Sequence, residues 1–244
     1  MTLISQWRSA KGQKTPDNRD AFAYARKQNE ALYIIADGAT SKIQSGLMAS
    51  VLCSKVINTF KQTSSDPIED LLSRLPEWQV ELRRLYPVAA ASYLIARVQV
   101  NNLVQTLHTG DCRLGFAPII SPERIDWKTS IHSLANAINS ESEDQLRKHA
   151  GRHSLTRTFN SRHYMQPEYQ EHQWSKGSVL IMATDGFWAE RSPDEQCQQL
   201  SDYSSVIQQP KDDCSYLLLT QPDSVINFRT ELINHLLEKK HKSS

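Results

Sequence analysis

The chain has 244 residues, of which 39% are hydrophobic and 23% are charged, and its formal net charge is +1. This near-neutral balance excludes a general electrostatic attraction to nucleic acid or to an anionic membrane surface. No run approaches the ~18 apolar residues of a membrane span, residues 1–14 lack the apolar core of a signal peptide, and the four cysteines form no CxxC pair. We therefore expect a cytoplasmic protein with reduced thiols and a single domain covering residues 1–244.

The first half of the chain predicts one strand and two helices. Residues 31–36 form a short apolar run of strand formers that ends at Asp37. Apolar residues then recur at helical intervals over 46–60, and again from 67 to 85. Pro76 lies inside the second stretch, and we expect it to break or kink that helix.

Strand signals begin at residue 89. Residues 89–98 and 103–107 are rich in strand formers, and Asn101-Asn102 between them is typical of a tight hairpin turn. Residues 113–116 are expected to continue the same meander.

The remainder of the chain is more polar. Its predicted elements are a helix near 143–150, a buried strand at 179–183, a helix that begins at Ser192-Pro193, a last strand at 215–220 and an amphipathic helix at 228–240. Hairpins combined with paired helices indicate an α+β layer structure, not a parallel doubly wound sheet.

Short aspartate motifs are the main functional signal. They are Asn18-Arg19-Asp20, Ala36-Asp37-Gly38, Gly110-Asp111-Cys112-Arg113, Thr184-Asp185-Gly186 and Asp212-Asp213. A single Asp-Gly pair is most often a plain turn. After a buried strand, however, the carboxylate lies at the rim of a sheet, and the glycine lets the backbone turn sharply. Carboxylates that converge from distant segments suit hard divalent cations, which prefer oxygen ligands.

The order of these motifs resembles that of the metal-dependent protein phosphatases of the 2C type. The usual signatures of that family are Asn-Glu-Asp, Ala-Asp-Gly, Gly-x-x-Ala-Ser, Gly-Asp-Ser-Arg, Leu-Thr-Arg, Ser-Asp-Gly-Leu-Trp and Asp-Asn. The segments that match them here are Asn18-Arg19-Asp20, Ala36-Asp37-Gly38, Gly46-Leu47-Met48-Ala49-Ser50, Gly110-Asp111-Cys112-Arg113, Leu155-Thr156-Arg157, Thr184-Asp185-Gly186-Phe187-Trp188 and Asp212-Asp213. Each motif is degenerate, but the ordered set from about residue 8 to residue 220 is specific.

The resemblance implies two packed antiparallel β-sheets flanked by helix pairs, an α-β-β-α sandwich, with a metal cleft at one end of the sheets. It implies that Asp37 bridges two Mn²⁺ or Mg²⁺ ions, with the Gly38 carbonyl as a further ligand. Asp185 and Asp212 would complete the shell of the first metal. Asp111 would lie with Asp185 near a weaker third metal.

The resemblance also implies a mechanism, in which a hydroxide held between two divalent ions attacks a phosphomonoester and Asp20 orients the water. Asp213 stands where an amide is usual, so either member of the Asp212-Asp213 pair is a candidate ligand, and we favour Asp212. Residues 117–175 would contain the variable flap of the family, and residues 221–244 a C-terminal helix and tail. The expected partner is a phosphorylated protein, the substrate of a serine/threonine kinase, and the expected state is a monomer.

The sequence departs from the family pattern at three places. Arg19 replaces the acid of Asn-Glu-Asp, which removes a carboxylate. The segment 12–16 lacks the arginine that holds substrate phosphate in many relatives, so Lys14 or Arg19 is the candidate, with a solvated loop charge as the equally weighted alternative for each. Ala39-Thr40 follows Gly38 where eukaryotic members carry a histidine general acid.

The histidines of the polar stretch offer a substitute acid. We expect them on the surface, with a helper acid among them as the alternative; they are His132, His149, His153, His163 and His172.

Two functional hypotheses from different classes remain. The first is an active serine/threonine phosphoprotein phosphatase, and the second is a pseudophosphatase that keeps the fold as a binding or regulatory module. Arg19 and the missing arginine favour the second. Retention of five carboxylates favours the first, because clustered carboxylates repel one another unless a cation neutralises them. An unrelated α+β binding protein with chance Asp-Gly turns is the third hypothesis.

Overall fold

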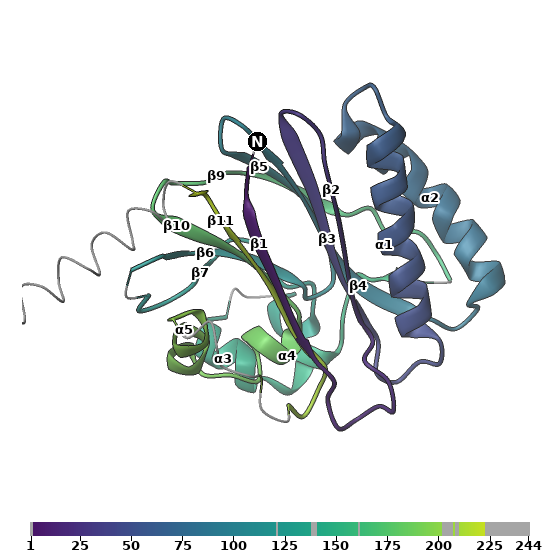
Figure 1. Ribbon diagram of the computed structural model, residues 1–244. Helices are drawn as coiled ribbons and strands as arrows, with labels where there is room; N and C mark the ends of the chain where they lie inside the picture. The colour runs from purple at the N-terminus through teal and green to yellow at the C-terminus, as the bar shows by residue number, and fades with distance from the viewer. Residues whose placement is uncertain are drawn as a thin grey trace, which may run out of the picture.

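Two antiparallel β-sheets pack face to face in the computed structural model, and helices cover their outer faces (Figure 1). The described residues are 2–120, 122–137, 141–160, 162–201, 207 and 210–222. The helices are α1 (Ser45–Gln62) and α2 (Pro67–Leu85) beside one sheet, and α3 (Glu143–Lys148), α4 (Asp185–Trp188) and α5 (Pro193–Ser201) beside the other. The predicted α-β-β-α sandwich is confirmed.

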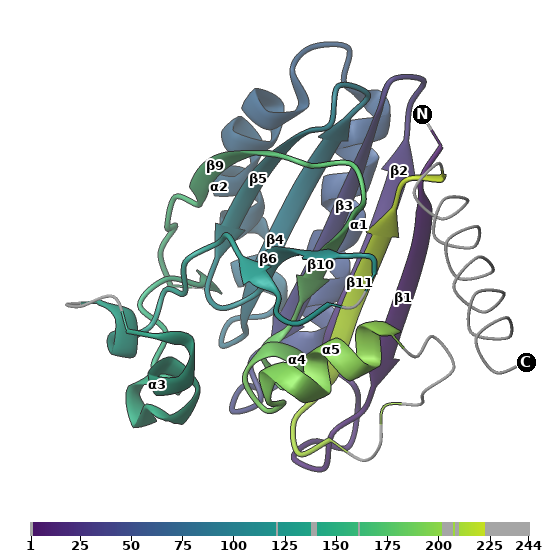
Figure 2. The same ribbon diagram turned by 90° about the vertical axis from the view of Figure 1, so that its left-hand side faces the viewer.

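The sheets have the strand orders β2-β3-β4-β5-β9, with β8 paired to β4, and β1-β11-β10-β6-β7. The strands of the first sheet are β2 (Asp20–Arg26), β3 (Glu30–Gly38), β4 (Ala90–Gln99), β5 (Leu103–Thr109), β8 (Phe159–Asn160) and β9 (Glu168–Gln173). Those of the second are β1 (Ile4–Ala10), β6 (Arg113–Pro118), β7 (Asp126–Trp127), β10 (Ser178–Ala183) and β11 (Cys214–Thr220). Figure 2 shows β10, β11 and β1 side by side, with α4 and α5 at their lower end.

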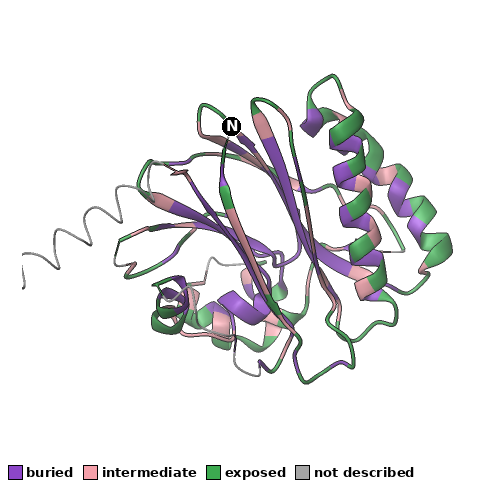
Figure 3. Cartoon of the chain, viewed as in Figure 1, coloured by how far each residue is buried: buried purple, intermediate pink, exposed green. Residues whose placement is uncertain are grey.

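Strand β3 shows why the central strands are apolar without alternation. Its Leu32 and Ile34 pack in the core under α1 and α2, whereas Tyr33 and Ile35 pack in the core between the two sheets. A strand that is covered on both faces has no solvent side, so both sets of side chains are apolar. The burial pattern in Figure 3 follows this layering, with buried sheet strands and outward faces of α1 and α2 that are exposed.

Helix α2 continues through Pro76, so the predicted break there is wrong, and a kink stays a prediction. Asp66 caps the helix by accepting hydrogen bonds from the backbone N–H groups of Ile68 and Glu69. Leu75 and Trp78, on either side of Pro76, are buried in the core that α1 and α2 form with the first sheet. Packing of this apolar stripe offsets the hydrogen bond that proline cannot make.

The predicted hairpin between β4 and β5 is confirmed, and Asn102 adopts a left-handed conformation with φ of 64°. The expectation that 113–116 continues the same meander is wrong. Residues Arg113–Pro118 form β6, which pairs with β10 in the opposite sheet. Gly110, with φ of 85°, turns the chain out of the first sheet after β5.

The polar stretch 117–175 is more ordered than its composition suggests. The predicted helix near 143–150 is α3, which begins with a capping box of Ser142 and Gln145. Two 3₁₀ turns, Leu134–Asn136 and Ala150–His153, flank it, and the polar edge strand β9 pairs with β5.

The predicted helix start at Ser192 is also confirmed, because Ser192 and Glu195 exchange capping hydrogen bonds. The helix expected at 228–240 lies outside the described residues. Across the part of the chain that the structure describes, no helix has both the length and the apolar character needed to cross a bilayer.

Candidate active site

A cleft of about 240 Å³ lies where the aspartate motifs meet. Four of the predicted carboxylates line it, namely those of Asp37, Asp111, Asp185 and Asp212. Asp20 is the direct partner of Asp37 in the register between β2 and β3. The structure therefore brings the five predicted carboxylates together from five separate segments.

Two of these aspartates must be followed by glycine, because another backbone segment lies too close for a side chain. A Cβ on Gly186 would lie 2.1 Å from the carbonyl oxygen of Asp213, and a Cβ on Gly38 would lie 2.6 Å from the backbone nitrogen of Gly46. Among the described glycines, only Gly110 and Gly177 have positive φ. The sequence argument that Gly38 and Gly186 free the backbone to turn is thus corrected, because these glycines allow another backbone segment to approach.

Asp111 is fixed by its neighbours on three sides. Gly110 places it at the end of a turn, and a Cβ on Gly110 would lie 2.1 Å from the Ser92 hydroxyl oxygen. The same hydroxyl donates to Asp111 Oδ1 at 2.7 Å. The indole Nε1 of Trp188 donates to the Asp111 carbonyl oxygen at 2.8 Å.

Burial and crowding disfavour the ionised form of several of these carboxylates. Burial, followed by repulsion from neighbouring aspartates, holds the pKa values of Asp37 and Asp185 well above their usual range. Burial also raises the pKa of Asp111, although a hydrogen bond from Ser92 opposes the shift. Each group would regain its ordinary ionisation if a cation lay among them.

Asp20 adds an unsatisfied acceptor to this cluster. The hydroxyl of Thr184 donates to Asp20 Oδ2 at 3.0 Å, but the buried Oδ1 has no hydrogen-bond partner. Burial raises the pKa of Asp20 to about 7, against the hydrogen bonds from Ser215 and Thr184. A crowded set of carboxylate oxygens with an unpaired buried oxygen fits hard cations such as Mg²⁺ or Mn²⁺.

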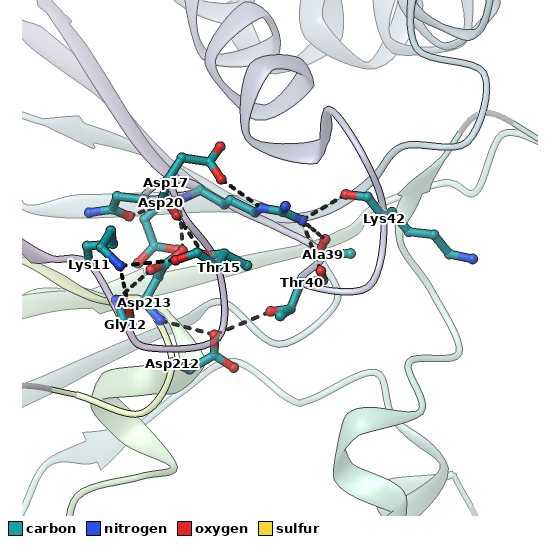
Figure 4. Close-up of polar contacts among 12 residues, drawn as sticks. Lys11, Gly12, Thr15, Asp17, Asp20, Ala39, Thr40, Lys42, Asp212 and Asp213 are labelled. Atoms are coloured by element: carbon teal, nitrogen blue, oxygen red, sulfur yellow. Dashed lines mark hydrogen bonds and ion pairs between the residues drawn. The ribbon is translucent and has the colours of Figure 1, made fainter.

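The structure separates the two members of the Asp212-Asp213 pair (Figure 4). Asp213 accepts hydrogen bonds from the backbone N–H groups of Gly12 at 2.7 Å and Arg19 at 2.8 Å, and so ties the loop after β1 to β11. Asp212 lines the cleft and accepts from the Thr40 hydroxyl at 3.3 Å. Asp212 is therefore the member whose side chain lies in the cleft.

The two predicted phosphate-binding residues differ in position. Lys14 lines the cleft, and its Nζ lies 2.6 Å from Asp212 Oδ2. Arg19 does not line it; its Nη1 donates to the carbonyl oxygens of Ala39, Thr40 and Lys42 at 3.0, 3.0 and 2.8 Å. Its guanidinium thus holds the loop that follows Gly38, and a role in phosphate binding stays a prediction.

Sequence reasoning missed Arg152. Its Nη1 lies 3.5 Å from Asp185 Oδ2, and its side chain is only 11% exposed. It belongs to the polar stretch without apolar periodicity, where the nearby Leu155-Thr156-Arg157 motif was the single available signal.

The histidines of the same stretch do not share one environment. His153 lines the cleft, and burial together with the charge of Arg152 lowers its pKa. His163 is exposed as expected, but His132 is 8% exposed, so the surface prediction is wrong for it.

This geometry can be compared with known proteins. The family model of protein phosphatase 2C matches residues 9–217. The chain belongs to the protein phosphatase 2C family. Among curated proteins, no sequence match was found.

Solved structures of bacterial phosphatases share the fold of this family member. The serine/threonine phosphatase of S. agalactiae is 16% identical with a TM-score of 0.75, covering 90% of this chain and 99% of that one. Stp1 from Staphylococcus aureus is 17% identical with a TM-score of 0.69, covering 91% and 96%. MsPP from Mycobacterium smegmatis is 20% identical with a TM-score of 0.66, covering 89% and 97%. At these identities the likeness establishes the fold alone.

Proposed function

We propose that this phosphatase 2C family member is an active, metal-dependent serine/threonine phosphoprotein phosphatase. The observation that carries the proposal is the convergence of five carboxylates at one cleft, where burial and repulsion from neighbouring aspartates hold the pKa values of Asp37 and Asp185 well above their usual range. A site that had lost its cations would have no physical reason to keep this arrangement. The same argument disfavours the pseudophosphatase hypothesis.

Asp37, Asp185 and Asp212, with the Gly38 carbonyl, would hold two Mn²⁺ or Mg²⁺ ions, and Asp111 would contribute to a weaker third site. When bound, such ions supply an activated water and neutralise charge on the phosphoryl group. Asp20, whose buried Oδ1 has no hydrogen-bond partner, would orient that water.

Two cations of the chain are suited to bind the substrate phosphate. Lys14 lines the cleft, and Arg152 Nη1 lies 3.5 Å from Asp185 Oδ2. We infer that Arg152 takes the role of the arginine that is missing from segment 12–16, because a guanidinium pairs with two phosphate oxygens at once. Arg152→Ala should then raise KM for a phosphopeptide more than Arg152→Lys does.

Covalent catalysis by cysteine is disfavoured. All four cysteines are buried free thiols. Burial raises the pKa of Cys53 to about 12 and that of Cys214 to about 11. Cys112 adjoins the site, but burial and the surrounding aspartates hold its pKa well above its usual range, which prevents thiolate formation. A cysteine thiolate therefore does not compete with water, the nucleophile that we propose.

The proposed substrates are phosphoproteins of the cytoplasm that a serine/threonine kinase modifies, and we propose that residues 1–244 act as one monomeric domain. The test is hydrolysis of p-nitrophenyl phosphate and of a phosphothreonine peptide by protein stripped of metal. Activity should return with Mn²⁺ or Mg²⁺ and vanish again in EDTA. Unchanged turnover in EDTA after stripping would refute the metal-dependent mechanism.

Variants of the carboxylates test the site itself. Asp37→Ala and Asp185→Ala should abolish hydrolysis, whereas Asp126→Ala, which removes an exposed carboxylate that does not line the cleft, serves as the matched control. If either cleft variant kept more than about a tenth of wild-type activity at saturating metal, the role given to that aspartate would be wrong.

A further inference from the structure

A cluster of two histidines and a glutamate lies behind the turn that carries Asp111. His108 lies near the end of β5, and Glu168 is its partner in register on β9. His132 lies between these two residues and the turn. None of the three lines the cleft. Both histidines are buried, with exposed fractions of 0% for His108 and 8% for His132.

The hydrogen bonds of His132 determine its tautomer. The backbone N–H of Gly110 donates to His132 Nδ1 at 3.2 Å, so this nitrogen carries no proton. The neutral ring is therefore protonated at Nε2, which donates to Glu168 Oε2 at 2.9 Å. Glu168, His132 and the Gly110 N–H thus form a continuous chain that ends one residue before Asp111.

Backbone hydrogen bonds connect His132 to two segments that contribute residues to the cleft. Its own N–H donates to the Gly110 carbonyl oxygen at 3.0 Å, so Gly110 is bonded to His132 through both of its backbone polar groups. The His132 carbonyl oxygen accepts from the N–H of Thr156 at 2.8 Å. Leu155, beside Thr156, lines the cleft, as Asp111 does.

The His132 ring is also held by stacking on His108, and its partner Glu168 is held by Ser130. The rings of His108 and His132 stack with centroids 4.8 Å apart and an interplanar angle of 9°. The hydroxyl of Ser130 donates to both oxygens of Glu168, at 3.2 and 3.1 Å. Burial acts to raise the pKa of Glu168, but hydrogen bonds from His132 and Gln170 outweigh it and lower the pKa to about 2, so the carboxylate is ionised at neutral pH.

We propose that His132 and Glu168 are positioning residues, which hold the Gly110-Asp111 turn so that the Asp111 carboxylate stays aimed into the cation site. The proposal rests on the proposed function, because it assumes that Asp111 contributes to cation binding. Gly110 adopts a φ of 85°, one of several conformations open to glycine, and its hydrogen bond to His132 favours this one.

The same three residues also have the composition of a small metal site, with ligand atoms within 4.8 Å of one another. Two features disfavour that role. A histidine ligand normally donates its second N–H to an acceptor, whereas His132 Nδ1 faces the N–H of Gly110, a donor. In addition, lone pairs in two nearly parallel stacked rings do not converge on one ion.

Two substitutions of His132 test its hydrogen bonds to Gly110 and to Glu168 separately. In His132→Asn the amide oxygen can take the place of Nδ1 and still accept from Gly110. In His132→Gln that acceptor is lost, while the longer amide can still reach Glu168. His163→Gln, at an exposed histidine outside the cleft, is the control.

We expect His132→Gln to raise the Mn²⁺ concentration for half-maximal activity about tenfold, as is typical for loss of a residue that supports a metal ligand. KM for p-nitrophenyl phosphate at saturating Mn²⁺ should change little, and His132→Asn should recover most of the Mn²⁺ affinity. Equal Mn²⁺ requirements for His132→Gln and His163→Gln would overturn the proposal, as would failure of His132→Asn to recover affinity while it remains folded.

A measurement that does not depend on activity keeps this test separate from the proposed function. NMR of protein labelled with ¹⁵N-histidine should show His132 protonated at Nε2 and unprotonated at Nδ1. A proton at Nδ1, or loss of the Nε2 proton on stoichiometric addition of Zn²⁺, would overturn the proposal. Absence of any metal-stimulated hydrolysis in the wild type, with the expected tautomer present, would refute the proposed function instead.

Discussion

Asp20→Asn is expected to stabilise the metal-free protein at alkaline pH while it impairs catalysis. The side chain lies at the start of β2 opposite Asp37, and its Oδ1 is buried without a partner. An amide at this position can still accept from Thr184, as Asp20 Oδ2 does at 3.0 Å. The substitution therefore removes a charge from the cluster with little change in shape.

The magnitude follows from the pKa of Asp20, which burial raises from 3.8 to about 7. In the unfolded chain this carboxyl loses its proton near its ordinary pKa, whereas in the folded protein it keeps the proton until pH 7. Ionisation therefore opposes folding increasingly as the pH rises from 4 through about 7. A pKa difference of about 3, at about 1.4 kcal/mol for each unit, sets an upper limit of about 4 kcal/mol above pH 7. Charges on Asp212 and Asp213 contribute to the shift, so the gain on substitution will be below this limit.

Urea unfolding in EDTA at pH 8 and at pH 5 measures the effect. At pH 8 Asp20→Asn should have the higher free energy of unfolding, and the difference should shrink at pH 5. Saturating Mn²⁺ should stabilise the wild type, because a ligand that binds only the folded state adds to the free energy of unfolding. Asp17→Asn, at a carboxylate that is 60% exposed, is the control. A metal-free Asp20→Asn variant no more stable than wild type at pH 8 would refute the electrostatic reasoning.

Three further predictions follow from the same geometry. Arg19→Ala should lower the free energy of unfolding by about 1–3 kcal/mol, because three carbonyl groups of the loop 39–42 lose a charged donor; a raised KM for phosphopeptide without any loss of stability would indicate phosphate binding instead. Gly186→Ala should reduce both stability, by about 1–3 kcal/mol or more, and activity, because the new Cβ would meet the Asp213 carbonyl oxygen at 2.1 Å; unchanged melting and turnover would show that the backbone yields. Burial lowers the pKa of His108 to about 4, so the metal-free wild type should lose on the order of 3 kcal/mol relative to His108→Gln as the pH falls from 6.5 to 4, and parallel stability–pH curves would contradict this.

Elements with a strong local pattern could be predicted from the sequence. The apolar runs at 31–36 and 179–183 are strands buried on both faces, and the helical periodicity at 46–60 gave α1. The aspartates that follow these strands were identified for the same reason, since a strand end and the turn after it are written in consecutive residues. The motif order was sufficient to predict the family, which the family model then confirmed.

Other features depend on segments that meet only in the folded chain. β9 is a polar edge strand, and its pairing with β5 supplies an order that its own sequence does not encode. The crossing of the chain from one sheet to the other after Gly110 likewise depends on which partner β6 finds, and this made the predicted meander wrong.

The sequence by itself identified the carboxylates that meet at the candidate site, because their motifs are local and ordered. Only the tertiary structure decided what surrounds them. It turned Asp213 toward two backbone N–H groups and left Asp212 in the cleft, and it brought Arg152 to Asp185 from a stretch without a readable pattern. Hydrogen bonds and ion pairs between residues far apart in the chain depend on the packing of whole layers, and no local periodicity records that packing.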